Sequence, residues 1–308
     1  MKQRRIVVAG GGGFVGRALC GALLEQGWEV VVLTRSLRER DDDVREAEWD
    51  GEQVGEWIQH LDGAEAVVNL TGRNINCRHT AENLAEIIGS RVHSVHILAS
   101  AIRHHVRLPP RLWVQASAVG YYGQREAEWC DETAVAGSGR LADICRLWEG
   151  AFFSVDVPRT RRILFRTGIV LGRNGGALPL LAHYTRWFLG GAAGSGRQYV
   201  SWIHHTDLTA MFLRALEYDN YYSGVYNAVA PEPVTNAEFM RILRRTLYRP
   251  WSPPVPAWAL KLGARLTNTE ATLALEGCRC APRRFLESGF RFQFSELGPA
   301  LKNIFHPT

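Results

Sequence analysis

The 308-residue sequence predicts an α/β fold, in which a doubly wound parallel sheet is followed by a smaller, mostly helical C-terminal lobe. Short β-branched runs alternate with helical stretches through the first half of the chain, and this alternation weakens after about residue 172. Four consecutive glycines directly follow the first apolar run. The length suits about two domains, and 46% hydrophobic with 22% charged residues excludes a disordered or collagen-like chain.

The expected strands are short apolar runs, typical of strands that are buried on both faces. They cover residues 5–9, 29–33, 64–70 and 112–116, and a further extended segment joins 163–165 to 168–171. Helical stretches lie between the strands at 14–26, 81–103 and 141–153. Because helices separate the strands along the chain, we expect parallel strands, and right-handed crossovers then place helices on both faces of the sheet.

The second half of the chain has a looser pattern. Helices are expected at 177–189, 208–217 and 236–247. Asp207 and Asn236 stand where helix N-caps should be. A short strand at 224–228 is expected to rejoin the sheet. We therefore predict a first domain over residues 1–172 and a lobe over 173–308, which ends in a helical segment of unassigned function.

The composition argues against several classes of protein. The six cysteines show no zinc-ligand spacing, so we expect free thiols in a reducing compartment and no metal site. No run of 18 apolar residues exists, and the N-terminal apolar run is too short for a signal peptide. We therefore expect a cytoplasmic protein with no membrane partner. The arginines are scattered and form no stripe, so nucleic-acid binding is not expected.

Lysine is nearly absent from this sequence. Only Lys2, Lys261 and Lys302 are lysines, and the other 33 of the 36 basic residues are arginines. A GC-rich genome alone could produce this bias. It nevertheless excludes any reaction that needs a lysine between positions 3 and 260.

The strongest local signal is the glycine loop GGGGFVG, with glycines at 10, 13 and 16 in a GxxGxxG spacing. Gly10 permits the tight turn from strand to helix, Gly13 lets the backbone approach a pyrophosphate, and Gly16 lets the helix pack against the sheet. The first helical residues, Phe14 and Val15, expose N–H groups to phosphate at the positive end of the helix. The loop predicts a Rossmann-type dinucleotide-binding domain; the alternative is a tight turn without a ligand.

The end of the second strand distinguishes NADP from NAD. An NAD-binding protein usually places Asp or Glu there to bind the ribose 2′-hydroxyl. This strand ends Leu-Thr-Arg-Ser at residues 33–36, without an acid. Arg35, beside Thr34, can donate to a 2′-phosphate, so we expect NADP(H) as the cofactor. The alternative for Arg35 is a solvated loop residue.

Several motifs in order resemble the extended short-chain dehydrogenase/reductases, also called the NAD-dependent epimerase/dehydratase superfamily. Besides the glycine loop, they are VVNLTG at 67–72, SAVGYYG at 117–123, RTGIVLG at 166–172, GSGRQ at 194–198, WIHHTDL at 202–208 and GVYN at 224–227. The match is nearer still to the atypical subgroup called epimerase family proteins, including the bacterial YfcH-like proteins. The resemblance implies cofactor contacts from Leu70, Thr71, Gly72, Arg91, Ala116 and Gly168. For Arg91 the alternative is a surface salt bridge.

The resemblance also exposes a missing catalytic pair. Typical members of the superfamily use Tyr-x-x-x-Lys on the helix after the fifth strand, but no such pair exists in this chain. Alignment on Glu149 puts Leu141 and Cys145 at the two positions. Ser117 and Tyr121 are the candidate catalytic substitutes, although Ala118 could fill the family serine position in place of Ser117, and both candidates could simply pack in a loop. Cys145 is expected to be a small buried residue, and Tyr122 a packing residue.

Two hypotheses for the function follow. The first is an NADP(H)-dependent oxidoreductase or epimerase-like enzyme that acts on an unknown small molecule through atypical catalytic residues. The second is a non-catalytic protein that senses NADP(H), which the missing pair favours. The resemblance further implies a homodimer formed through the helices at 81–103 and 141–153.

Overall fold

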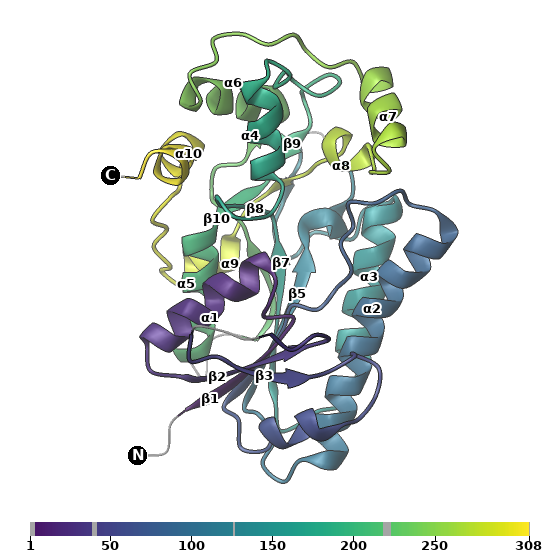
Figure 1. Cartoon of the computed structure of the whole chain (residues 1–308), viewed down its shortest axis with the longest axis vertical. Coiled ribbons are helices and arrows are strands. Elements are labelled where there is room, and N and C mark those ends of the chain that lie inside the picture. The colour runs from purple at the N-terminus through teal and green to yellow at the C-terminus, as the bar shows by residue number, and fades with distance from the viewer. Residues whose placement is uncertain (1–3, 39–41, 126, 218–222, 308) are drawn as a thin grey trace.

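A computed structural model describes residues 4–38, 42–125, 127–217 and 223–307. Its central sheet has seven parallel strands in the order β11-β7-β5-β4-β1-β2-β3 (Figure 1). The strands are β1 (Arg5–Ala9), β2 (Glu29–Thr34), β3 (Arg45–Glu48), β4 (Ala66–Asn69), β5 (Leu112–Ala118), β7 (Arg161–Thr167) and β11 (Gly224–Ala228). Strand order reverses at β1, so the predicted Rossmann-type, doubly wound fold is confirmed.

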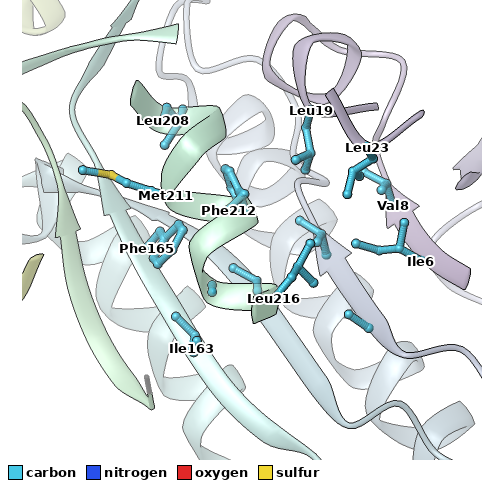
Figure 2. Packing of buried hydrophobic residues seen from close by; sticks show 14 of the residues in the cluster. Ile6, Val8, Leu19, Leu23, Ile163, Phe165, Leu208, Met211, Phe212 and Leu216 are labelled. Atoms are coloured by element: carbon cyan, nitrogen blue, oxygen red, sulfur yellow. The ribbon is translucent and has the colours of Figure 1, made fainter. Parts of the chain in front are cut away.

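Helices cover both faces of the sheet. Helices α1 (Phe14–Glu25) and α5 (His205–Glu217) lie on one face, and α2 (Ala81–Ser100) and α3 (Arg140–Ser154) lie on the other. A short π-helical turn over residues 101–105 extends α2. Figure 2 shows the first core, where Leu19 and Leu23 of α1 and Phe212 of α5 pack toward Ile6 of β1 and Phe165 of β7. Burial of the alternating sheet residues on both faces explains the continuous apolar runs of the strands.

The C-terminal lobe has its own core beyond the end of the sheet. Its main helices are α4 (Leu178–Arg186), α6 (Asn236–Thr246), α7 (Ala257–Leu266) and α10 (Leu297–Phe305). Further short elements of the chain, not all of them in the lobe, are β6 (Trp129–Cys130), β8 (Ile169–Leu171), β9 (Tyr199–Val200), β10 (Trp202–His204), β12 (Val234–Thr235), β13 (Arg279–Cys280), α8 (Thr272–Leu275) and α9 (Arg283–Glu287). Trp202, Phe239 and Leu301 are buried together at its centre.

The division at residue 172 describes the chain only in part. Strand β11 pairs with β7, as predicted. Helix α5 also packs on the sheet beside α1, and Phe285 and Phe290 from the C-terminal region enter the same core. Segments after residue 172 therefore complete one face of the first domain.

Two N-cap predictions are wrong. Asp207 lies inside α5, and its carboxylate accepts hydrogen bonds from the backbone N–H groups of Gln293 (2.7 Å) and Phe294 (3.0 Å). The cap of α6 is Thr235, whose hydroxyl accepts from the N–H of the third residue along. Asn236 instead accepts from Ala193 N at 2.8 Å. The side chains of Asp207 and Asn236 thus bind backbone groups of segments distant in the sequence. The local spacing of residues could not reveal these contacts.

The structure bears on the expected membrane segments, cysteines, metal site and dimer helices. Among the described residues, no helix is long and apolar enough to cross a membrane. None of the six cysteines forms a disulfide, and the described residues hold no cluster of His, Cys, Asp or Glu suited to a metal ion. Helices α2 and α3 lie side by side (Figure 1). The cytoplasmic location and the homodimer stay predictions.

Candidate dinucleotide site and a buried polar cluster

The glycine loop has the close approaches that its spacing predicted. Gly10 directly follows β1 with a φ of +76°, and a Cβ there would lie 3.0 Å from the carbonyl carbon of Leu70. A Cβ on Gly16 would lie 2.5 Å from Gly11 Cα, so only glycine lets α1 pack so near the loop. A Cβ on Gly12 would meet nothing within 4 Å. The loop is thus tight toward the protein and open on its other side, as a phosphate cradle must be.

Phe14 and Val15 are the first residues of α1, and no side chain caps this helix end. The ring of Phe14 packs against Gly172 and Gly175, where an added Cβ would lie 2.5 Å from ring atoms. Val15 packs against the first core. Their side chains therefore anchor the helix start, and any contact with a cofactor would come from their backbone N–H groups.

The rim of the site lies at the end of β2. Thr34 is half-buried and its hydroxyl donates to Ser36 O at 3.2 Å, whereas Arg35 is exposed. Strand β3 runs beside β2 and pairs Thr34 with Glu48. This strand was not predicted, because Arg-Glu-Ala-Glu is short and lacks an apolar run.

The floor of the site follows β4. Thr71 Oγ1 is buried and has no hydrogen-bond partner among the described residues, while Thr71 N donates to Asn69 Oδ1 at 3.0 Å. The Asn69 amide in turn donates to Ser94 Oγ (3.1 Å) and Gln115 Oε1 (3.0 Å). Buried polar atoms usually find partners, so the free Thr71 hydroxyl is available to a ligand.

Arg91 lies beneath Gly72 and does not form a surface salt bridge. Its guanidinium donates to the carbonyls of Arg73 (3.0 Å) and Ile87 (2.9 Å) and lies over the Trp148 ring. A Cβ on Gly72 would come within 2.9 Å of this guanidinium. Burial lowers the pKa of Arg91 from its usual value. The position next to the β4 loop suits the predicted cofactor contact, which stays a prediction.

The remaining predicted cofactor residues border the sheet end. Ala116 lies within β5 opposite Phe165. Gly168 lies between β7 and β8, where a Cβ would come within 2.6 Å of Ser201 O. Gly168 therefore permits close packing of the two backbones.

A buried ion pair lies where β5 and β7 end. Arg166 donates to Glu149 through Nε (3.0 Å to Oε1) and Nη2 (2.8 Å to Oε2), a bidentate arrangement. Ser117 Oγ donates to Glu149 Oε1 at 2.7 Å. All three residues are 4–5% exposed. The hydroxyl proton of Ser117 is thus already held by Glu149, which weakens the prediction of a direct catalytic role for Ser117.

The same arginine contacts both tyrosines of the SAVGYYG motif, which lie in a 3₁₀ helix over residues 119–122. Its Nη1 donates to Tyr122 Oη at 3.0 Å, and Tyr122 Oη donates to Asn227 Oδ1 at 2.7 Å. Tyr122 is fully buried, and burial raises its pKa above the usual value. The guanidinium carbon of Arg166 also lies 3.5 Å from the centroid of the Tyr121 ring, and Tyr121 is partly exposed.

The two positions of the missing catalytic pair are filled by packing residues. Leu141 and Cys145 both face Gly120, where an added Cβ would lie 3.4 Å from Leu141 Cβ and 3.6 Å from Cys145 Sγ. Burial, together with the neighbouring Glu149, raises the pKa of Cys145 to about 12. A thiol with so high a pKa is a poor nucleophile, so Cys145 is the small buried residue that its position predicted.

A C-terminal segment crosses from the lobe to the loop before α2 and to the loop that follows Tyr122, which sequence reasoning missed. Asn268 O accepts from Arg78 N at 3.0 Å, and Gly277 O accepts from Arg125 N at 3.0 Å. Strand β13 pairs with β6. Within this segment, burial raises the pKa of Glu276, and the nearby charge of Glu270 adds to the effect. No local pattern pointed to these contacts, because the two sides of each are about 150 to 190 residues apart.

Together, the fold and the glycine loop define a nucleotide-binding protein of the Rossmann class. Residues 6–140 match the NAD-dependent epimerase/dehydratase family, and residues 255–304 match a domain of unknown function, DUF1731. The chain belongs to the NAD-dependent epimerase/dehydratase family, because full-length relatives within it are more than 30% identical.

The relatives include two epimerase family proteins, human SDR39U1 and YfhF of Bacillus subtilis. The human protein is 36% identical over 97% of this chain and 99% of its own, and YfhF is 32% identical over 97% of both. A crystal structure of human SDR39U1 with NADPH superimposes with a TM-score of 0.87 at 35% identity, covering 97% of this chain and 98% of that chain. A nucleoside-diphosphate sugar epimerase from Corynebacterium glutamicum matches with a TM-score of 0.78 at 32% identity, over 98% of this chain and 58% of that chain. The finer likeness to YfcH-like proteins stays a prediction.

Proposed function

We propose that this protein binds NADP(H) and uses it to act on a small-molecule substrate as an oxidoreductase or epimerase-like enzyme. The observation that carries the proposal is the glycine loop, which packs tightly against the protein on one side and has open space on the other. The exposed Arg35, with no acid at the end of β2, favours NADP(H) over NAD(H). The human relative crystallised with NADPH supports the same choice.

The residues present fit the cofactor. The α1 N-terminus and Gly12 would hold the pyrophosphate, the unpartnered Thr71 hydroxyl would bind nearby, and Arg35 would bind the 2′-phosphate. When bound, the nicotinamide supplies or accepts a hydride. All other chemistry must come from the side chains of the protein.

Within the proposal, Tyr121 exchanges a proton with the substrate, and Arg166 positions Tyr121. The partly exposed Tyr121 ring is held against a fixed guanidinium, which Glu149 and Tyr122 orient. The charge of Arg166 is balanced by Glu149, so its role is to hold the Tyr121 ring in place. Ser117 acts indirectly, because its proton orients Glu149.

Replacing Tyr121 with phenylalanine is expected to lower kcat by about a hundredfold or more, because general acid–base groups contribute on that order. NADPH affinity should remain unchanged, since the ring still packs on Arg166. The measurement is NADPH consumption over a panel of carbonyl compounds, together with product analysis of nucleotide sugars incubated with NADP⁺, because epimerisation consumes no net cofactor. NADPH fluorescence is the binding assay. Tyr184→Phe on α4, another exposed tyrosine, is the matched control. NADPH binding without turnover of any compound would instead favour the sensor hypothesis, which the engaged Ser117 hydroxyl and the missing lysine support.

Replacing Arg35 with alanine tests the cofactor preference. A hydrogen bond to a charged group is worth about 1.5–3 kcal/mol, so NADPH affinity should fall by about ten- to a hundredfold. NADH affinity should hardly change, because NADH lacks the 2′-phosphate. Arg107→Ala, at an exposed arginine far along the chain, is the control. An equal loss for both nucleotides would contradict the proposed role of Arg35.

A further inference from the structure

An exposed aromatic surface lies at the end of the C-terminal lobe, where α4 and α6 end. It consists of Trp187, Phe188, Leu189, Tyr248 and Trp251, which we call the aromatic tip. Their exposed fractions are 69%, 48%, 57%, 75% and 66%. In Figure 1, α4, α6 and the connection from α6 to α7 form the upper end of the molecule. Five neighbouring apolar side chains so exposed are unusual for a surface without a partner.

The two segments that form the tip, residues 186–189 and 248–252, are joined by hydrogen bonds. Ser252 Oγ donates to Phe188 O at 2.6 Å, and Arg249 Nε donates to Arg186 O at 3.0 Å. The Arg249 guanidinium also lies over the Phe188 ring, 5.3 Å from its centroid. The tip is therefore one surface, built by side-chain contacts between residues about 60 positions apart.

Backbone geometry singles out two of these aromatic residues. Phe188 and Tyr248 have φ values of +60° and +57°, in the left-handed region that bulky residues rarely adopt. Each follows a helix at the position where glycine is usual, and the next residues, Leu189 and Arg249, donate their N–H groups back into the preceding helix at 2.9 and 2.8 Å. Glycine would fit both positions with less strain. The turns therefore do not require aromatic side chains at these positions, and the two side chains contribute instead to the exposed apolar surface.

The two segments that form the tip contain no acidic residue. Residues 157–206 and 239–269 contain no Asp or Glu. These segments include the whole tip. They also carry the exposed Arg186 and Arg245 and the half-buried Arg249 beside it. Segments that carry arginines and no acidic residue favour an anionic partner.

We propose that the aromatic tip docks on an anionic membrane surface. Aromatic side chains prefer the interface between lipid and water, and arginine binds the phosphates of anionic headgroups. A protein partner would be expected to meet charges of both signs at the rim of an interface, whereas an anionic bilayer favours the one sign found here. Contact of this kind needs no membrane-spanning helix, so it is compatible with the lack of such a helix among the described residues. It departs from the sequence-based expectation that the protein has no membrane partner.

The test is sedimentation of the full chain with phosphatidylcholine vesicles, with and without phosphatidylglycerol. We expect binding to the anionic vesicles that weakens with added salt, and little binding to phosphatidylcholine alone. The double variant Phe188→Gly/Tyr248→Gly should bind at least about tenfold more weakly while its thermal stability stays equal or rises, because strain is relieved. The double variant Arg186→Gln/Arg245→Gln should lose about fivefold for each arginine on anionic vesicles.

The matched control is Leu108→Ser/Val135→Ser, which removes two apolar side chains exposed by 60% and 72% elsewhere. This control should bind vesicles as the unaltered protein does. The proposal is overturned if the unaltered protein stays in the supernatant with anionic vesicles, or if the control loses as much binding as the glycine variant. It is equally overturned if the glycine variant leaves vesicle binding intact and instead dissociates a dimer on gel filtration, since the tip would then contact a second copy of the chain.

Discussion

Replacing Glu149 with alanine is expected to lower the free energy of unfolding by about 3–5 kcal/mol, because it leaves the guanidinium of Arg166 buried without its counter-charge. Burial alone would lower the pKa of Arg166, but the hydrogen bonds and charge of Glu149 hold it above the usual value. The pair is nearly inaccessible to water, with side chains 5% and 6% exposed. Urea denaturation followed by circular dichroism measures the change.

Two controls separate burial from charge. Asp156→Ala removes the partner of Arg103 in an ion pair exposed by 48% and 63%, and it should cost less than about 1 kcal/mol. The double variant Glu149→Leu/Arg166→Met removes both charges and should recover most of the stability that the single variant loses. A loss below about 1 kcal/mol for Glu149→Ala would show that water reaches the pair.

Replacing Gly16 with alanine is expected to weaken NADPH binding by about a hundredfold and to cost about 1–3 kcal/mol of stability. The new Cβ would lie 2.5 Å from both the Cα and the O of Gly11, and backbone atoms cannot move aside as a flexible side chain can. The helix start must shift outward, which moves the N–H groups that would hold the pyrophosphate. NADPH fluorescence titration and thermal denaturation measure the two effects.

Gly21→Ala in the same helix is the matched control, because a Cβ there meets nothing within 4 Å. It should bind NADPH normally and gain about 0.5–1 kcal/mol of stability, since alanine suits a helix better than glycine. If Gly16→Ala bound NADPH as tightly as Gly21→Ala does, the loop would not be the pyrophosphate site.

Local patterns predicted the sheet and its helices well. Strands β1 and β11 have the predicted boundaries, and α1 ends one residue earlier than expected. Continuous apolar runs and 3.6-residue spacing are properties of neighbouring residues, so a single chain reveals them. Strand β3 was missed because its sequence, Arg-Glu-Ala-Glu, has one small apolar residue among three charged ones and only its pairing with β2 makes it a strand.

The sequence by itself determined two facts about this protein: a glycine loop built for a dinucleotide and the lack of any lysine for the usual catalytic pair. Both depend on residue type within a few positions or on a simple count. The tertiary structure alone decided that Ser117 is bound to Glu149 and that Arg166 lies against Tyr121. It also decided that residues 268–280 contact the loop before α2, the loop after Tyr122 and strand β6. Buried polar groups take whichever partner the packed chain brings within about 3 Å, and that choice depends on long-range contacts that no local pattern encodes.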